Sequence, residues 1–320
     1  MSSSKTNCSN NRELTFYSFI FKKTKHMEIC FQSISSTVNF ENWLKSFKEI
    51  NDSLLMEIDT TQKLFIAKTY TNDKTIVKYG KLDFDAAALE VVSVTGKDRK
   101  KVTLDEWNTA NTARIKVGIY QILDKFIKVI NRFGSTDNYK IVIKFDQNTD
   151  GDFVAQRIEF KSLTLNMAAS AAELTEFKYI TDEQFLNGIA KIENPLYFGI
   201  NADTSKALVD ISNIFSADAK KDIIDFRIKK ESGEWTLHAI DYNGQSYDYQ
   251  IGYLDQNRTD EATEVTDDVH IPVVRQNFIL GTKSDGENGC IVISANEDGG
   301  GKVAVHSGEN FITIIASVRV

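Results

Sequence analysis

The 320-residue sequence has only three cysteines, and they lie far apart at Cys8, Cys30 and Cys290. None belongs to a CxxC pair, so the sequence predicts neither a disulfide framework nor a zinc site, and it favours a reducing compartment. The four histidines are scattered as widely, which argues against a metal site because metal ligands occur in clusters. We therefore expect neither a metal nor a cofactor.

Long apolar runs are also missing, and no stretch approaches the roughly 18 residues of a membrane span. Positive charge is in deficit, with 38 Lys and Arg against 45 Asp and Glu and a net charge of −7. General attraction to nucleic acid is therefore excluded, and any DNA contact must come from a local basic surface. The content of 42% hydrophobic and 26% charged residues is typical of a soluble globular protein with room for two domains.

Enzyme motifs are missing too. The glycine run 299–301 is not followed by a predicted helix, so it indicates a turn and not a phosphate-binding loop. The acidic pair Asp267 and Asp268 lies in a polar loop, where solvated carboxylates are the simpler interpretation. We expect no catalytic residues and a protein that is not an enzyme; the alternative is an active site assembled from residues far apart in the sequence.

The main positive feature is a unit of one strand, one amphipathic helix and three strands that occurs four times. The predicted helices cover 39–50, 118–133, 203 or 204 to 216, and 275–282. The predicted strands cover 28–34, 54–58, 63–70, 75–79, 114–117, 139–145, 153–160, 163–167, 196–200, 223–229, 235–241, 246–253, 271–274, 290–295, 302–306 and 311–318. The helices start roughly 70–85 residues apart, which exceeds the period of most solenoid repeats, so the units are expected to pair into two domains.

The second helix is the clearest, because its apolar residues recur at helical spacing and Gly134 follows as a typical C-terminal residue. Its apolar face consists of Ile119, Ile122, Leu123, Phe126, Ile130 and Phe133. The step from Asp150 to Gly151 predicts a hairpin turn between the strands that follow.

The predicted organisation has an N-terminal extension at 1–26, domain 1 at 27–168, a connector at 169–195 and domain 2 at 196–320. The extension is expected to be disordered; a second interpretation is that Met27 is the natural start. Two further stretches exceed the repeated unit, an irregular excursion at 80–113 and an acidic loop at 255–268.

Two domains of two such units each resemble the DNA sliding clamps of the proliferating cell nuclear antigen kind and of phage polymerases. Segment 114–143 resembles the clamp strand that leads into the second helix, 271–283 resembles the short fourth helix, and 312–320 resembles the closing strand. The resemblance covers about residues 27–320 and rests mainly on element order. It implies an α+β fold with antiparallel sheets outside and helices lining a channel, and the extra segments suggest a divergent, viral member.

The resemblance implies a polymerase processivity factor that encircles double-stranded DNA without reading its sequence. The expected partners are a DNA polymerase and a clamp loader, and six domains in a ring require a homotrimer. The expected location is intracellular, at the site of DNA replication, or the host cytoplasm for a phage protein. The alternatives are a monomeric or dimeric viral processivity subunit, or a virion protein of stacked sheets.

Cations on the helices are the candidate DNA contacts, since a sliding protein needs loose phosphate contacts without base recognition. The candidates are Lys45, Lys48, Gln121, Lys125, Lys128, Arg132, Lys206, Lys220, Lys221, Arg275 and Lys283. The alternative is an ordinary solvated lysine face, because amphipathic helices commonly have one.

The resemblance also implies that partner peptides dock beside the connector and near the C-terminus. The candidate partner-binding residues are Phe177, Tyr179, Ile180, Phe185, Val318 and Val320. The alternative is that these aromatic residues only anchor the connector to a sheet.

Overall fold

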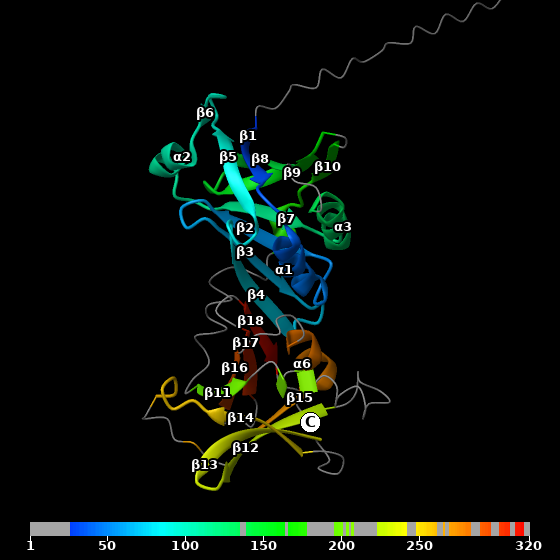
Figure 1. Cartoon of the computed structure of the whole chain (residues 1–320), viewed down its shortest axis with the longest axis vertical. Coiled ribbons are helices and arrows are strands. Elements are labelled where there is room, and N and C mark those ends of the chain that lie inside the picture. Colours follow the sequence, from blue (N-terminus) through cyan, green and yellow to red (C-terminus); the bar gives the residue numbers. More distant parts are fainter. Residues whose placement is uncertain are drawn as a thin grey trace, which may run out of the picture.

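The computed structural model describes residues 26–134, 139–163, 166–177, 195–200, 203–204, 206–207, 223–241, 248–260, 265, 269–282, 289–295, 301–307 and 311–316. The predicted order of one strand, one helix and three strands is present in all four units, with the third helix described at 203–204 and 206–207. In Figure 1, units 1 and 2 form a first lobe and units 3 and 4 form a second lobe.

The first lobe contains two units joined by an excursion. Unit 1 consists of β1 (Met27–Ser33), α1 (Val38–Lys48), β2 (Leu54–Asp59), β3 (Leu64–Tyr70) and β4 (Ile76–Asp83). The excursion consists of β5 (Leu89–Thr95), β6 (Lys101–Val102) and α2 (Leu104–Ala110). Unit 2 consists of β7 (Ile115–Ile119), α3 (Leu123–Gly134), β8 (Lys140–Gln147), β9 (Phe153–Lys161) and β10 (Asn166–Ser170).

The short 3-10 helix η1 (Leu174–Phe177) follows the first lobe, and the second lobe repeats the pattern. Unit 3 consists of β11 (Leu196–Ile200), the helical residues, β12 (Ile223–Glu231), β13 (Glu234–Asp241) and β14 (Asp248–Leu254). Unit 4 consists of β15 (His270–Val274), α6 (Arg275–Thr282), β16 (Gly289–Ala295), β17 (Gly301–Ser307) and β18 (Phe311–Ala316).

Three sequence predictions differ from the structure in detail. The second helix begins at Leu123 and not at 118, because Gly118 and Ile119 pair with β2 and extend β7. The strand predicted at 163–167 begins at Asn166. The excursion contains a helix that pattern reading missed, although Thr103 and Glu106 form a capping box at its start.

The two units of each lobe exchange strands. In the first lobe β1 pairs with β8 and β7 pairs with β2, so each unit's first strand adds to its sister's second strand. The second lobe repeats this exchange with the pairs β11–β16 and β15–β12. Each lobe therefore has an internal pseudo-twofold arrangement, which follows from the repeated element order.

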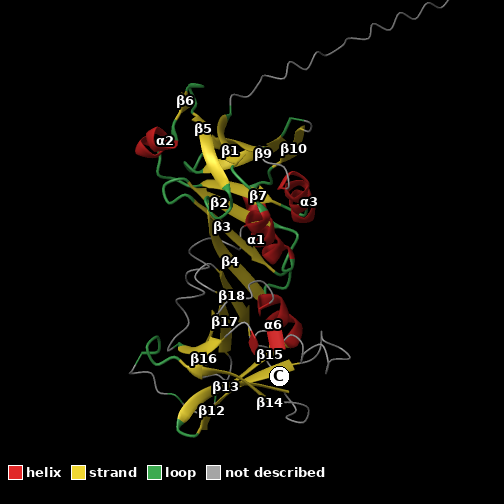
Figure 2. Ribbon diagram, viewed as in Figure 1, coloured by secondary structure: helices red, strands yellow, loops and turns green. Residues whose placement is uncertain are grey.

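Among the described strands, one pair, β4–β18, joins the sheets of the two lobes (Figure 2). The five Cα partners run antiparallel from Phe311 opposite Gly80 to Ile315 opposite Ile76. Thus the last strand of unit 1 pairs with the last strand of unit 4. The sheet is continuous from one lobe to the other.

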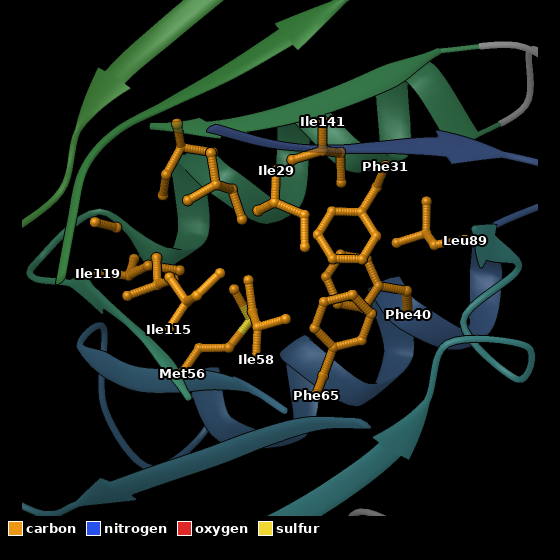
Figure 3. Packing of buried hydrophobic residues seen from close by; sticks show 14 of the residues in the cluster. Ile29, Phe31, Phe40, Met56, Ile58, Phe65, Leu89, Ile115, Ile119 and Ile141 are labelled. Atoms are coloured by element: carbon orange, nitrogen blue, oxygen red, sulfur yellow. The ribbon is translucent and has the colours of Figure 1, made fainter. Parts of the chain in front are cut away.

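The first core lies between the two sheet segments of the first lobe, and the helices α1 and α3 close its side. Ile29, Phe31 and Ile141 on one segment point toward Met56 and Phe65 on the other (Figure 3). The predicted apolar residues of the first helix, Phe40, Trp43, Leu44 and Phe47, are all buried in this core. A second core fills the other lobe, and its buried residues range in sequence from Leu196 to Ile315.

The beginning of the connector is held against β7 and β2. Ala172 donates a backbone hydrogen bond to the Gly118 carbonyl (2.9 Å), and Phe177 packs on Leu55 and Tyr70. A Cβ atom on Gly118 would meet the Ala172 carbonyl oxygen at 2.7 Å, so glycine permits this close approach. Among the helices that the structure describes, none has the length and apolarity to cross a membrane.

Candidate DNA-facing surface and docking edges

The helices α1 and α3 pack side by side and share polar contacts along their seam. Asn131 on α3 donates a hydrogen bond to Glu41 on α1 (Nδ2 to Oε1, 2.8 Å), and Lys45 Nζ lies 2.5 Å from the same oxygen. Glu41 is buried, whereas Lys45 is exposed. Lys45 of α1 therefore lies beside the seam with α3.

A second group of charges joins the C-terminal end of α1 to the start of α3. Asp52 Oδ1 accepts a hydrogen bond from the Asp124 backbone N–H (2.8 Å) and lies 3.8 Å from Lys48 Nζ. Lys128 Nζ lies 2.6 Å from Asp124 Oδ2, and this hydrogen bond lowers the pKa of Asp124 and raises the pKa of Lys128. Lys48 and Lys128 thus belong to one network that crosses both helices.

Two exposed cations of α3, Lys125 and Arg132, have no carboxylate partner among the residues that the structure describes. Gln121 is exposed too, but it precedes the helix in a left-handed turn (φ 55°), and its backbone N–H bonds to Ser53 Oγ. Its predicted place on the polar face of the second helix is therefore wrong, although its side chain remains accessible beside the start of α3.

The second lobe supplies fewer of the predicted contacts. Lys206 is exposed on the described part of the third helix. Arg275, at the first position of α6, is only 3% exposed, so the prediction that it faces DNA is wrong: a residue sealed by packing makes no phosphate contact. Lys220, Lys221 and Lys283 lie outside the described residues.

The charges of the helical surface nearly balance, which limits what it can do. Lys45, Lys48 and Lys128 each face a carboxylate, whereas Lys125 and Arg132 face none among the described residues. The Lys48–Asp52 and Lys128–Asp124 pairs are open to solvent, where an ion pair contributes about 0–1 kcal/mol, so an anion can exchange with these two carboxylates at little cost. Such a surface suits weak, salt-sensitive and sequence-independent contact.

The outer edges of β10 and of β14 over 248–251 have no partner strand among the described residues, and the same holds for one edge each of β6 and β15. The strands β10 and β14 are the last strands of units 2 and 3. They correspond to β4 and β18, which are the last strands of units 1 and 4 and pair with each other. Beside β10 an apolar groove of about 260 Å³ lies against α3. Its lining includes Phe126, Val129, Phe160 and Met167.

Sequence reasoning missed this groove because residues 169 and 170 were assigned to the connector. The apolar run Met167, Ala168 and Ala169 was the available signal, since three such residues rarely stand on a fully solvated edge. Met167 is 42% exposed, so a large apolar side chain lies open to solvent there.

The connector side holds a different hollow, a polar recess of about 490 Å³. Its lining includes Lys48, Tyr70, Tyr120, Gln121, Glu176 and Phe177. Phe177 is 3% exposed and packs edge-on against Tyr120 at 6.2 Å between ring centroids, so it anchors the connector and does not offer itself to a partner. Tyr179, Ile180, Phe185, Val318 and Val320 lie outside the described residues.

The fold itself was compared with known proteins. No protein-family model matches the sequence, and no curated protein matches it. PCNA of A. fulgidus, solved with the C-terminal region of FEN-1 bound, superposes with a TM-score of 0.55 at 9% identity, over 92% of this chain and 98% of that one. The fold is that of a sliding clamp.

Two bacterial clamps agree with this assignment. The DNA polymerase sliding clamp of Bacillus subtilis has a TM-score of 0.55 at 10% identity, over 95% of this chain and 67% of that chain. A DNA polymerase III beta subunit of Eubacterium rectale has a TM-score of 0.57 at 13% identity, over 100% of this chain and 68% of that chain. The predicted α+β clamp fold is confirmed, and in length the chain corresponds to the archaeal protein.

The archaeal and the Bacillus neighbours are both named as clamps. Within the described ranges, no group of three His, Cys, Asp or Glu side chains has the placement to hold a metal ion. The arrangement instead offers a weakly basic helical surface, two open strand edges and an apolar groove.

Proposed function

We propose that this protein is a DNA sliding clamp: a homotrimeric ring that encloses double-stranded DNA and tethers a DNA polymerase during replication. In this proposal residues 27–168 and 196–320 are the two clamp domains, and six domains complete the ring. The observation that carries the proposal is the match between the internal β4–β18 junction and the two open edges of β10 and β14.

Ring closure follows from the pseudo-symmetry. The strands β4 and β18 end units 1 and 4 and pair with each other. By contrast, β10 and β14 end units 2 and 3, and the outer edges of β10 and of β14 over 248–251 have no described partner. Pairing β10 of one copy with β14 of the next repeats the internal junction between chains. A head-to-tail interface of this kind forms a closed ring when the rotation between copies closes.

The groove beside β10 supports the same assembly. At the internal junction Phe47 of α1 covers Phe311 of β18, with 6.0 Å between ring centroids. The corresponding cover between copies would come from the helix of unit 3, seated over Met167 and Phe126 of the neighbour. Covering Met167 removes exposed apolar surface, which stabilises association by roughly 25 cal/mol per Å².

DNA contact is assigned to the helical surface of Lys45, Lys48, Lys125, Lys128 and Arg132, together with Gln121 and Lys206. These contacts reach phosphates and not bases, so the ring remains free to move along the duplex. The partners in this proposal are a DNA polymerase and a clamp loader at the site of replication, and the polar recess beside Phe177 is the candidate docking region.

Topological retention tests the ring directly and needs no identified loader. Ala168→Cys on β10 and Gln250→Cys on β14, with Cys8→Ser to limit side reactions, place one thiol on each open edge. A flexible bifunctional crosslinker is applied while the protein is incubated with nicked circular plasmid. Crosslinked protein is expected to stay on circular DNA in high salt and to be released when one restriction cut linearises the plasmid.

Native mass spectrometry of the unmodified chain is expected to show a trimer at micromolar concentration. A strict monomer, together with crosslinked protein that leaves circular and linear DNA equally, would overturn the ring. Longer primer-extension products on a long primed template would then separate a non-ring processivity subunit from a virion protein, since only the former stimulates a polymerase.

A further inference from the structure

A cluster of cations covers the face of β8 and β9 that is turned away from the core. Its members alternate along the strands with the buried Ile141, Ile143, Ile158 and Phe160, so they point outward. This outer cation cluster consists of Lys140, Lys144, Arg157 and Lys161. Lys140 stands opposite Lys161, and Lys144 stands opposite Arg157.

Glu159 lies at the centre of the cluster and forms ion pairs with three of the four cations. Its carboxylate lies 2.7 Å from Lys144 Nζ, 3.0 Å from Arg157 Nε and 2.9 Å from Lys161 Nζ. Although burial raises the pKa of this carboxyl, the hydrogen bonds from Lys144 and Lys161 outweigh it and hold the pKa at about 2. One negative charge therefore faces several positive charges in a chain that is acidic overall.

Lys140 has no ion-pair or hydrogen-bond partner in the part of the chain that the structure describes, and it directly faces another lysine. Like charges at opposed strand positions are destabilising, by an amount comparable to the 0.2–1 kcal/mol or so of a favourable pair. The same row across the sheet runs from Gln32 on β1 through Lys140 and Lys161 to Asn166 on β10. Four adjacent side chains thus present donors on one line, which suits an anion.

A second row lies four residues further along β8, where Lys144 stands beside Arg157. Glu28 on β1 is the strand partner of Lys144, so this row is less positive than the first. On the other side of β9, β10 places the short side chains of Ala168 beside Glu159 and of Ser170 beside Arg157. These short side chains leave the cations uncovered. The rows are about 13 Å apart, at roughly 3.3 Å for each strand residue.

We propose that the outer cation cluster binds an extended acidic segment of a partner protein, with one carboxylate over Lys140 and Lys161 and a second over Lys144 and Arg157. In an extended chain, side chains four residues apart stand on the same face with the same spacing of about 13 Å. Acidic residues at positions i and i+4 therefore match the two rows, and a neutral residue at i+2 lies over Glu159.

Nucleic acid fits this cluster less well than a peptide does. Each strand of a duplex carries a phosphate for about every 3.4 Å of rise, so a bound strand places a phosphate over Glu159 as well as over the cations. A peptide can leave that position uncharged. The cluster also lies on the sheet face, away from α3, and the assignment does not depend on ring formation.

Fluorescence anisotropy with the full chain tests the assignment. The probe is a labelled eight-residue Thr/Val peptide with Glu at its second and sixth positions; the comparison probes are the same peptide with Gln at both positions and an eight-nucleotide oligothymidine. Salt-sensitive binding of the Glu peptide is expected, and Lys140→Gln should weaken it by about fivefold. Lys63→Gln is the matched control, because Lys63 is also an exposed lysine without a carboxylate partner among the described residues.

Glu159→Gln distinguishes a binding surface from a merely structural cluster. Removing the competing carboxylate should increase the affinity for the Glu peptide by about fivefold and let oligothymidine bind. Absence of Glu-peptide binding at millimolar protein, equal loss in Lys140→Gln and Lys63→Gln, or a preference of the unmodified chain for oligothymidine would each overturn the proposal. Failure of the ring experiments would leave these expectations unchanged, since a monomer presents the same face.

Discussion

Lys78 Nζ lies 4.8 Å from the ring centroid of Phe311, across the strand pair that joins the two lobes. The Phe47 ring on α1 lies on the same ammonium group at 5.7 Å, so two aromatic faces enclose a fully buried cation. A cation over desolvated rings is stabilised by about 2 kcal/mol. The junction between the lobes thus depends on a contact that involves both of them.

Phe311→Ala should weaken this junction. The ring packs against Phe47 and Lys78, and its removal leaves both without their partner on β18, so we expect unfolding free energy to fall by about 3 kcal/mol. Urea unfolding measures the change, and Phe311→Leu, which keeps apolar volume, should lose less than half as much. A loss below about 1 kcal/mol in Phe311→Ala would contradict this role of the ring.

Gly118→Ala should dislodge the start of the connector. The added Cβ would lie 2.7 Å from the Ala172 carbonyl oxygen and 2.8 Å from the Phe177 ring, so backbone or ring must move, at a cost of about 1–3 kcal/mol. Limited proteolysis should cut faster near 172–177. Gly199→Ala is the control, because a Cβ there meets nothing within 4 Å and should leave cleavage unchanged.

The stability that Glu159 contributes should depend on pH. Its folded-state pKa of about 2 lies below the ordinary 4.5, so the contribution is present above about pH 4.5 and is lost as pH falls toward 2. At neutral pH Glu159→Gln should be about 1–3 kcal/mol less stable than the unmodified chain. Urea midpoints across this acidic range should converge for the two proteins; a constant difference would argue against the ion pairs.

The double reversal Lys125→Glu and Arg132→Glu should weaken binding to duplex DNA, because these are the α3 cations without a carboxylate partner among the described residues. Removing two phosphate contacts should lower the slope of log affinity against log salt by about two. Fluorescence anisotropy at several salt concentrations measures it. Lys63→Glu, on the hairpin between β2 and β3, is the control. An equal effect there would mean that net charge, and not the position of the cations, determines DNA affinity.

Met167→Asp should prevent ring formation, since it places a charge in the apolar groove between β10 and α3. Native mass spectrometry should show the monomer in place of the trimer. Val92→Asp is a matched control because Val92 is also a strand residue and is 41% exposed, against 42% for Met167. Trimers in both variants would place the interface elsewhere.

Periodicity in the sequence was enough to predict the repeated unit, most element positions and the buried residues of α1. These features depend on neighbouring residues, because helical and strand spacing of apolar side chains is a local property. The predicted α6 coincides with the observed helix Arg275–Thr282, and β12 and β18 begin where they were expected. The prediction of the clamp fold rested mainly on element order.

Contacts between distant segments decided the rest. Arg275 occupies a helix start that looks solvent-facing in the sequence, yet tertiary packing buries it, and Gly118 continues a strand because β2 is there to pair with it. The exchange of strands between units and the β4–β18 junction join residues far apart in the chain. Which strand edges stay open, such as that of β10, depends on the same pairings. Strand pairing depends on which backbone groups meet in space, and a local pattern carries no record of that choice.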